Sequence, residues 1–203
     1  MHTLSEKKMI AITGSMGSGK SEVSKYVSQL YPVIDCDKIN AHLLEKGEKG
    51  YHKLIQLDWV VLDENGQIDK KEMARCMFSD SEKRKEAESI LHPLIFEEIN
   101  IWKEKQNASY LFVEVPLLFE IQAQSYFDEI WCVYCDLDTA IQRLIEYRHF
   151  TYDQAMARIK KQLSVDYKKK NSDILIENNG NKEQLYHQID IILGRRKKWK
   201  IKY

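Results

Sequence analysis

The feature that most constrains this chain is a glycine-rich segment, residues 9–22, with the sequence MIAITGSMGSGKSE. The stretch from Gly14 to Ser21 fits the phosphate-loop pattern G-x-x-x-x-G-K-[ST]. A short apolar run precedes it, and apolar residues recur at helical spacing after it. A strand, a glycine turn and a helix N-terminus together present unpaired N–H groups and a positive helix dipole to an anion. The segment therefore predicts a nucleotide-phosphate site, with a chance glycine turn as the alternative.

Within this loop we expect Lys20 to reach the β- and γ-phosphates and the Ser21 hydroxyl to ligate Mg²⁺. The glycines allow positive φ angles and let phosphate oxygens approach the backbone closely. The loop alone identifies neither the nucleotide nor the group that accepts a phosphoryl group.

The bulk composition is that of an ordinary globular protein. The 203 residues are 43% hydrophobic and 31% charged, with a formal net charge of zero, so nothing in the composition suggests bulk binding to nucleic acid or an anionic membrane. The N-terminus has no apolar leader and no run reaches membrane-spanning length, so we expect a cytoplasmic protein. The basic C-terminal segment GRRKKWKIKY is expected to be a solvated tail, with an RNA or lipid contact as the alternative.

Two of the four cysteines, Cys132 and Cys135, form a C-x-x-C pair. They lie in EIWCVYCD, which has the pattern of a strand, where an odd separation places side chains on opposite faces. We therefore expect buried structural thiols, not a redox or zinc pair.

A second short strand, PVID, ends close to two acids, Asp35 and Asp37. Ligands of open parallel sheets bind at the carboxyl ends of strands, so we expect both carboxylates beside the phosphate loop. One could solvate magnesium or position a loop, and the other could accept a proton from an attacking hydroxyl. The alternative is that Asp37 caps the helix that follows it.

Residues 38–107 are charged and mostly helix-patterned, with one strand candidate, LDWVVL, at residues 57–62. A connection this long between two strands of one sheet predicts an inserted helical subdomain that binds substrate. The last helix of this region is expected to be interrupted around His92 and Pro93. His92 could position substrate, or the pair could simply mark a helix kink.

Three further strands are expected, at residues 110–120, 129–136 and 173–178. The strand in the first of these segments ends at Glu114, which is followed by Pro116, and this place at a strand end would let Glu114 hold Mg²⁺ through water. A helix cap or a solvated acid is the alternative for Glu114. The last strand ends at Asn178, at the same edge of the sheet.

Between the last two strands lies a cation-rich helical segment, residues 136–172. Thr151 and Gln154 form the capping box T-x-x-Q, which predicts a helix start near residue 152. Surface solvation explains most of the cations. A basic helical hairpin beside a phosphate loop can also act as a lid whose arginines neutralise transition-state charge. We choose Arg143 and Arg148 for that role.

These elements predict an α/β fold, a five-stranded parallel sheet flanked by helices of the P-loop NTPase type. We expect residues 1–203 to form a single P-loop kinase domain. Its core comprises about residues 1–37, 108–140 and 170–203, its helical substrate-binding insertion about 38–107, and its helical lid about 141–169.

With these residues in view, the sequence resembles the dephospho-coenzyme A kinase family over residues 9–190. The phosphate loop alone is shared by many nucleotide-binding proteins, whereas the ordered set of motifs is far more specific. That set is ITGSMGSGKS, VIDCD, LHPLI, EVPLLFE, QRLIEYR and SDILIENNG.

The resemblance implies transfer of the ATP γ-phosphoryl group to the ribose 3′-hydroxyl of dephospho-CoA, with Mg²⁺ as cofactor. It implies that Asp37 is the catalytic base and that the inserted helices hold the nucleotide and pantetheine parts of the acceptor. The expected catalytic residues are Asp37, Lys20, Arg143 and Arg148. The expected ATP-binding residues are Gly14, Gly17, Ser18, Gly19, Lys20, Ser21, Glu22 and Asn178. The expected acceptor-binding residues are Thr13, Asp35, Asp37, His92, Pro93 and Glu114, and the expected metal contacts are Ser21 and, through water, Glu114.

Three positions depart from the family pattern. Glu22 replaces a threonine after the loop serine, Ala41 stands where an arginine is common, and Val165 replaces a basic residue for which Lys168 could compensate. The alternatives are therefore another small-molecule or nucleoside-monophosphate-type kinase, or an ATP-binding regulator with weakened catalysis. A GTPase is disfavoured because the sequence lacks an N-K-x-D motif. We expect small-molecule substrates, no nucleic-acid or membrane partner, and a monomer or weak homo-oligomer.

Overall fold

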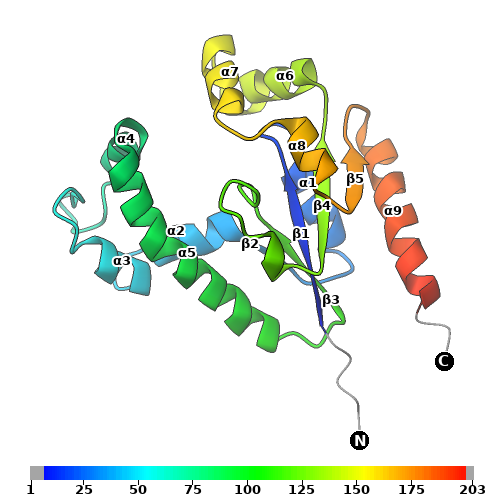
Figure 1. The fold of residues 1–203 in the computed structure, drawn as a ribbon, viewed down its shortest axis with the longest axis horizontal. Helices are drawn as coiled ribbons and strands as arrows, with labels where there is room; N and C mark the ends of the chain where they lie inside the picture. Colours follow the sequence, from blue (N-terminus) through cyan, green and yellow to red (C-terminus); the bar gives the residue numbers. More distant parts are fainter. Residues whose placement is uncertain (1–6, 200–203) are drawn as a thin grey trace, which may run out of the picture. The chain divides into compact units, whose positions relative to one another are not determined.

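The computed structural model describes residues 7–199, with side chains described as far as Gly194. The chain divides into two compact units (Figure 1). One contains the chain up to Ile34 together with the chain from Asn107 onward, and the other is Asp35–Gln106.

The first unit is built on a five-stranded sheet with the order β2-β3-β1-β4-β5. The strands are β1 (Lys8–Gly14), β2 (Val33–Asp35), β3 (Tyr110–Glu114), β4 (Glu129–Tyr134) and β5 (Ile174–Glu177). β1 is central and runs parallel to both neighbours, pairing Ile12 with Glu114 of β3 and Gly14 with Val133 of β4. This register brings the end of β1 beside the end of β3. The predicted five-stranded parallel fold is confirmed.

The helices of this unit are α1 (Lys20–Val27), α6 (Leu137–Arg148), α7 (Tyr152–Lys160), α8 (Val165–Lys170) and α9 (Lys182–Trp199). Their apolar faces explain the packing. Val23 and Val27 of α1 pack with Leu185 and Ile189 of α9 against side chains of β1, β3, β4 and β5. These residues are at most 2% exposed, so α1 and α9 cover one face of the sheet with a dry core.

The predicted lid segment lies beyond the carboxyl ends of β1 and β4, where α6 and α7 pack together (Figure 1). The predicted capping box is present: the Thr151 hydroxyl accepts from the Gln154 N–H, and the Gln154 side chain accepts from the Thr151 N–H. The helix begins at Tyr152, as predicted. Ile141, Leu144 and Ala155 form a small separate core between α6 and α7.

The second unit is helical, with α2 (Cys36–Leu43), α3 (Lys49–Leu54), α4 (Lys70–Ser79) and α5 (Ser81–Glu104). The predicted strand at residues 57–62 is wrong. Only Leu62 forms a bridge, an antiparallel one with Ile68. Trp59 is buried in the helical core and its indole N–H donates to Glu86 at 2.7 Å. The apolar residues of this run therefore pack into the core between the helices, and their backbone does not pair as a strand.

The predicted interruption at His92 and Pro93 is also wrong, because α5 is one helix of 24 residues that contains Pro93. A proline inside a helix loses one backbone hydrogen bond and crowds the preceding turn. Burial of Ala87, Leu91 and Leu94 on the same helix offsets that cost.

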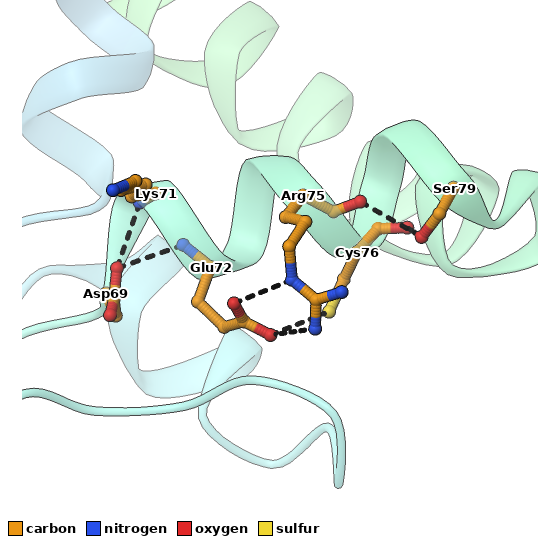
Figure 2. Close-up of polar contacts among 6 residues, drawn as sticks. All are labelled: Asp69, Lys71, Glu72, Arg75, Cys76 and Ser79. Carbon is orange, nitrogen blue, oxygen red and sulfur yellow. Dashed lines mark hydrogen bonds and ion pairs between the residues drawn. The ribbon is translucent and has the colours of Figure 1, made fainter.

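Helix α4 is held at its start by a side-chain cap (Figure 2). Asp69 accepts from the N–H groups of Lys71 and Glu72 at 3.0 and 2.9 Å. The Glu72 side chain in turn accepts from Arg75 Nε at 2.8 Å, in an exposed ion pair between residues three apart on the helix. The cap satisfies donors that a helix start otherwise leaves to water.

We expect Asp69→Ala to destabilise the protein by about 1 kcal/mol, because alanine removes the cap acceptor. Urea unfolding followed by circular dichroism measures this. The matched variant Asp69→Asn keeps an acceptor at the same place and should stay close to the parent. Equal losses in both variants would contradict a capping role.

Candidate active site

The phosphate loop follows β1 directly and leads into α1. Gly17 and Gly19 have φ angles of 80° and 90°, in the left-handed region that favours glycine. A Cβ atom on Gly19 would lie 2.2 Å from Asn178 Nδ2, and one on Gly17 would lie 2.7 Å from the Ala140 carbonyl oxygen. Both the backbone angles and the closeness of other segments of the protein therefore require glycine at these two positions.

Lys20 is the first residue of α1, and its ammonium group folds over the loop. Nζ donates to the carbonyl oxygens of Gly14 and Ser15 at 3.1 and 3.0 Å. A positive charge is thereby held at a helix N-terminus, which is itself electropositive.

Ser21 and Glu114 come together across the β1–β3 pair. Ser21 Oγ donates to Glu114 Oε1 at 2.9 Å, and Glu114 is only 5% exposed. A hydroxyl and a carboxylate oxygen are hard donors that suit Mg²⁺ held partly through water. Among the residues that the structure describes, no three His, Cys, Asp or Glu side chains gather at one point.

Other predicted residues border the loop. Asn178, just after β5, donates from Nδ2 to the Ser18 carbonyl oxygen at 2.8 Å in a buried contact. The hydroxyls of Thr13 and Ser18 are buried, and neither has a hydrogen-bond partner within the described part of the chain. The contact of Asn178 with the Ser18 carbonyl therefore holds the loop in shape from the end of β5, two strands away from β1 in the sheet.

The two predicted lid arginines differ in their positions. Arg143 reaches the loop, with Nη1 at 3.5 Å from the Gly17 carbonyl oxygen. Arg148 lies in the last turn of α6 and is exposed. The structure thus brings one of the two arginines to the phosphate loop.

Gln162 also contacts the loop, and it was not among the predicted site residues. It follows α7, and its Oε1 accepts from the Met16 N–H at 2.9 Å. The two residues are 146 positions apart in sequence. The local sequence pattern around either residue cannot predict a contact between residues so far apart in the sequence.

The side chain of Glu22, predicted to bind ATP, contacts α9 instead of the loop opening. It accepts from Lys182 Nζ at 3.0 Å and from the Tyr186 hydroxyl. The Tyr186 hydrogen bond, followed by the Lys182 charge, lowers the pKa of Glu22 against the opposing effect of burial. Glu22 therefore joins α1 to α9.

We expect Tyr186→Phe to lower the melting temperature by a few degrees at neutral pH, because Glu22 loses its main donor. Phenylalanine keeps the ring stacked on Tyr26, where the centroids are 4.0 Å apart. A carboxyl whose pKa is lowered by folding stabilises the protein above its unfolded pKa, near 4.5, and loses this effect as pH falls through the folded value. The difference from the parent should therefore shrink below pH 4.5.

Thermal melts from pH 3 to pH 8 test this, with Tyr152→Phe as the matched control, since Tyr152 is exposed on α7. A pH-independent difference would show that the hydroxyl acts on some group other than Glu22.

The remaining predicted residues belong to the second unit. Asp35 caps α2, accepting from the Asp37 N–H at 2.9 Å, so the capping role weighed for Asp37 falls to Asp35. Asp37 lies exposed in the first turn of that helix. His92 and Pro93 lie in α5, where burial lowers the pKa of His92. Their roles toward substrate stay predictions.

The predicted structural thiols are confirmed. Cys132 and Cys135 are both buried and unpaired. Burial is the main cause that raises the pKa of each thiol, so both are protonated at neutral pH. The strand β4 ends at Tyr134, so Cys135 lies just beyond it.

Comparison with known proteins gives a consistent result. A family model described as dephospho-CoA kinase matches residues 8–184. A dephospho-CoA kinase from Bacillus cereus is 36% identical over 198 residues, covering 95% of this chain and 98% of the relative. One from Carboxydothermus hydrogenoformans is 36% identical over 199 residues, covering 96% and 95%.

Solved structures agree on the fold. The crystal structure of TT1252 from Thermus thermophilus superposes with a TM-score of 0.82 at 29% identity, covering 94% of this chain and 98% of that one. A dephospho-CoA kinase from Campylobacter jejuni has a TM-score of 0.67 at 24% identity, covering 96% of this chain and 100% of that one.

Within the residues that the structure describes, every helix is too short or too polar to span a lipid bilayer.

Proposed function

The chain belongs to the dephospho-CoA kinase family, and from that premise we propose how its own residues carry out the family's reaction. The family comprises ATP-dependent kinases with an alcohol acceptor, which carry out the last step of coenzyme A synthesis. The resemblance drawn from the ordered motifs is thereby confirmed. The observation that supports a catalytic role for this chain is the phosphate loop with Lys20 on it and the Ser21–Glu114 contact beside it.

In this proposal the loop binds the phosphates of ATP. The backbone N–H groups at the start of α1 and the Lys20 ammonium hold the β- and γ-phosphates. Arg143 enters from the lid and stabilises the charge that develops on the transferring group. Ser21 and Glu114 would hold Mg²⁺, which when bound neutralises charge on the phosphate oxygens.

The acceptor is the ribose 3′-hydroxyl of dephospho-CoA. Asp37 orients this hydroxyl and takes its proton as the new O–P bond forms and the bond to the β-phosphate oxygen breaks, which releases ADP. Asp35, His92 and Pro93 of the second unit contact the acceptor. A cytoplasmic location and a monomer or weak homo-oligomer stay predictions.

An ADP-release assay with Mg-ATP tests the acceptor. We expect turnover with dephospho-CoA and no turnover above background with adenosine or cytidine 5′-monophosphate. Equal rates with a nucleoside monophosphate would favour a nucleoside-monophosphate kinase. ATP binding without turnover on any acceptor would favour the regulator suggested by the departures at Glu22, Ala41 and Val165.

A further inference from the structure

One lysine of the cation-rich segment is fully buried. Lys168 lies in α8, whereas most lysines lie at the surface of a protein. Burial raises the pKa of the Cys132 thiol on β4, and the Lys168 charge is the main cause that opposes this rise, so the ammonium group lies near that thiol. Cys132 alternates along β4 with Trp131 and Val133, which pack in the core formed with α1 and α9. Lys168 therefore lies over the opposite face of the sheet.

The buried ammonium group pairs with one carboxylate. Lys168 Nζ lies 2.8 Å from Oε1 of Glu120, in the segment after β3. The angles at Nζ are not those of a hydrogen bond, so the attraction is one between charges. Burying an ion pair costs desolvation free energy, and replacing such a pair by apolar side chains is often neutral or stabilising. Stability alone therefore does not account for a fully buried lysine at this place.

The same carboxylate oxygen holds the connection between α7 and α8. Glu120 Oε1 also accepts from the Leu163 N–H at 3.1 Å. Leu163 directly follows Gln162, whose Oε1 accepts from the Met16 N–H at 2.9 Å. Two adjacent residues thus attach this connection to the segment after β3 and to the phosphate loop. Lys168 neutralises the acceptor on which the first attachment depends.

The second attachment fixes the backbone of the phosphate loop. Met16 lies inside the loop, and the N–H groups of such a loop are the donors that bind phosphate oxygens. The Met16 N–H is directed to Gln162 instead, so this contact helps to decide which donors of the loop face the phosphates. A misplacement of about 1 Å at a reacting group can cost roughly 10²-fold in rate. The contact therefore bears directly on the donor half of the reaction.

We propose that Glu120 and Lys168 are positioning residues for phosphoryl transfer. Their ion pair fixes the Leu163 N–H and thereby holds Gln162 against the phosphate loop. This inference rests on the proposed function and deepens it, because it concerns how the ATP site is kept in shape. Neither residue touches a substrate, and both act through the connection between α7 and α8.

Two double variants separate the acceptor atom from the charges. Lys168→Met with Glu120→Gln removes both charges and keeps an oxygen that can accept from the Leu163 N–H. Lys168→Met with Glu120→Leu removes that acceptor as well. Both partners are replaced together, because the loss of one leaves the other charge buried and unpaired. Circular dichroism and thermal melts show whether each variant is folded.

We expect the variant with Glu120→Leu to lower kcat/KM for ATP by roughly tenfold, the upper range for one lost hydrogen bond. Its KM for dephospho-CoA should stay at the parental value, because the acceptor site is not altered. The variant with Glu120→Gln should recover most of the loss. The matched control is the exposed pair of Lys85 and Glu82, whose charged atoms are also 2.8 Å apart. Lys85→Met with Glu82→Leu should keep the parental kinetics.

Gln162→Met tests the same contact without disturbing the buried pair. Gln162 is half-buried, and methionine has a similar volume but lacks the oxygen that accepts from Met16. We expect a similar loss in kcat/KM for ATP. Adding Gln162→Met to the variant with Glu120→Leu should cause no further loss, because both changes act on one contact.

Several outcomes would overturn the positioning role. They are parental kcat/KM for ATP in Gln162→Met or in the folded variant with Glu120→Leu, equal losses in the two double variants, and additive losses on combination. Titration of a labelled ATP analogue without acceptor keeps this inference apart from the proposed reaction. A parent protein that binds ATP but leaves dephospho-CoA unphosphorylated would overturn the proposed function. Weaker ATP binding in the variant with Glu120→Leu, with recovery in the variant with Glu120→Gln, would still support the positioning role.

Discussion

We expect Asp37→Asn to lower kcat with dephospho-CoA by roughly 10²–10⁴-fold and to leave the dissociation constant of ATP nearly unchanged. Asparagine has the shape of aspartate but cannot take the proton of the 3′-hydroxyl. Asp37 is exposed in the first turn of α2, so the substitution removes no packing. Steady-state kinetics gives the loss in turnover, and fluorescence titration with a labelled ATP analogue gives the affinity.

The control for this variant is Asp58→Asn, at an exposed aspartate of the same unit. It makes the same chemical change and should retain the parental rate. Circular dichroism checks that both variants keep their helices. An Asp37→Asn protein with the full parental rate would remove Asp37 from the mechanism.

We expect Lys20→Met to reduce kcat/KM for ATP by roughly 10²–10³-fold, the size of effect typical of the loss of one preorganised electrostatic contact. Methionine keeps much of the aliphatic stem but lacks the ammonium that donates to the Gly14 and Ser15 carbonyl oxygens. We expect both weaker ATP binding and slower turnover, because the β- and γ-phosphates carry charge in the ground state and in the transition state.

Lys25→Met is the matched control, since Lys25 is exposed in the last turn of the same helix. It should retain parental kinetics with ATP and a similar melting temperature. If Lys20→Met retained parental kcat/KM, the loop would not be the donor site.

Sequence reasoning succeeded where local chemistry decides the structure. The run from Met9 to Ser21 contains its own strand, its own turn glycines and its own helix start, and the structure has all three. The capping box at Thr151 is similar, because its two hydrogen bonds join residues three apart. Glu114 was expected at a strand end, where it could hold Mg²⁺ through water, and its Oε1 lies 2.9 Å from Ser21 Oγ.

It failed where long-range packing outweighs a local pattern. Residues 57–62 look like a strand, but no partner strand exists for them among the described residues beyond the Leu62 bridge, and Trp59 packs among helices. Pro93 predicts a break, but the buried residues on either side hold α5 together.

Contacts between residues far apart in the sequence were also not predicted. Gln162 meets Met16 across 146 positions, and Glu22 meets Tyr186 across 164. No spacing rule connects such residues. The basic C-terminal segment from residue 195 onward lies outside the described side chains, and its role stays a prediction.

The central claim is that this chain moves the γ-phosphoryl group of ATP to one specified hydroxyl. The most direct measurement is phosphorus NMR and mass spectrometry of the product formed from Mg-ATP with dephospho-CoA, run beside its 3′-deoxy analogue. We predict one new phosphate ester at the 3′ position, ADP in equal amount, and no phosphorylation of the analogue. Phosphorylation of the 3′-deoxy analogue, or ATP consumption with no new ester on dephospho-CoA, would contradict the account.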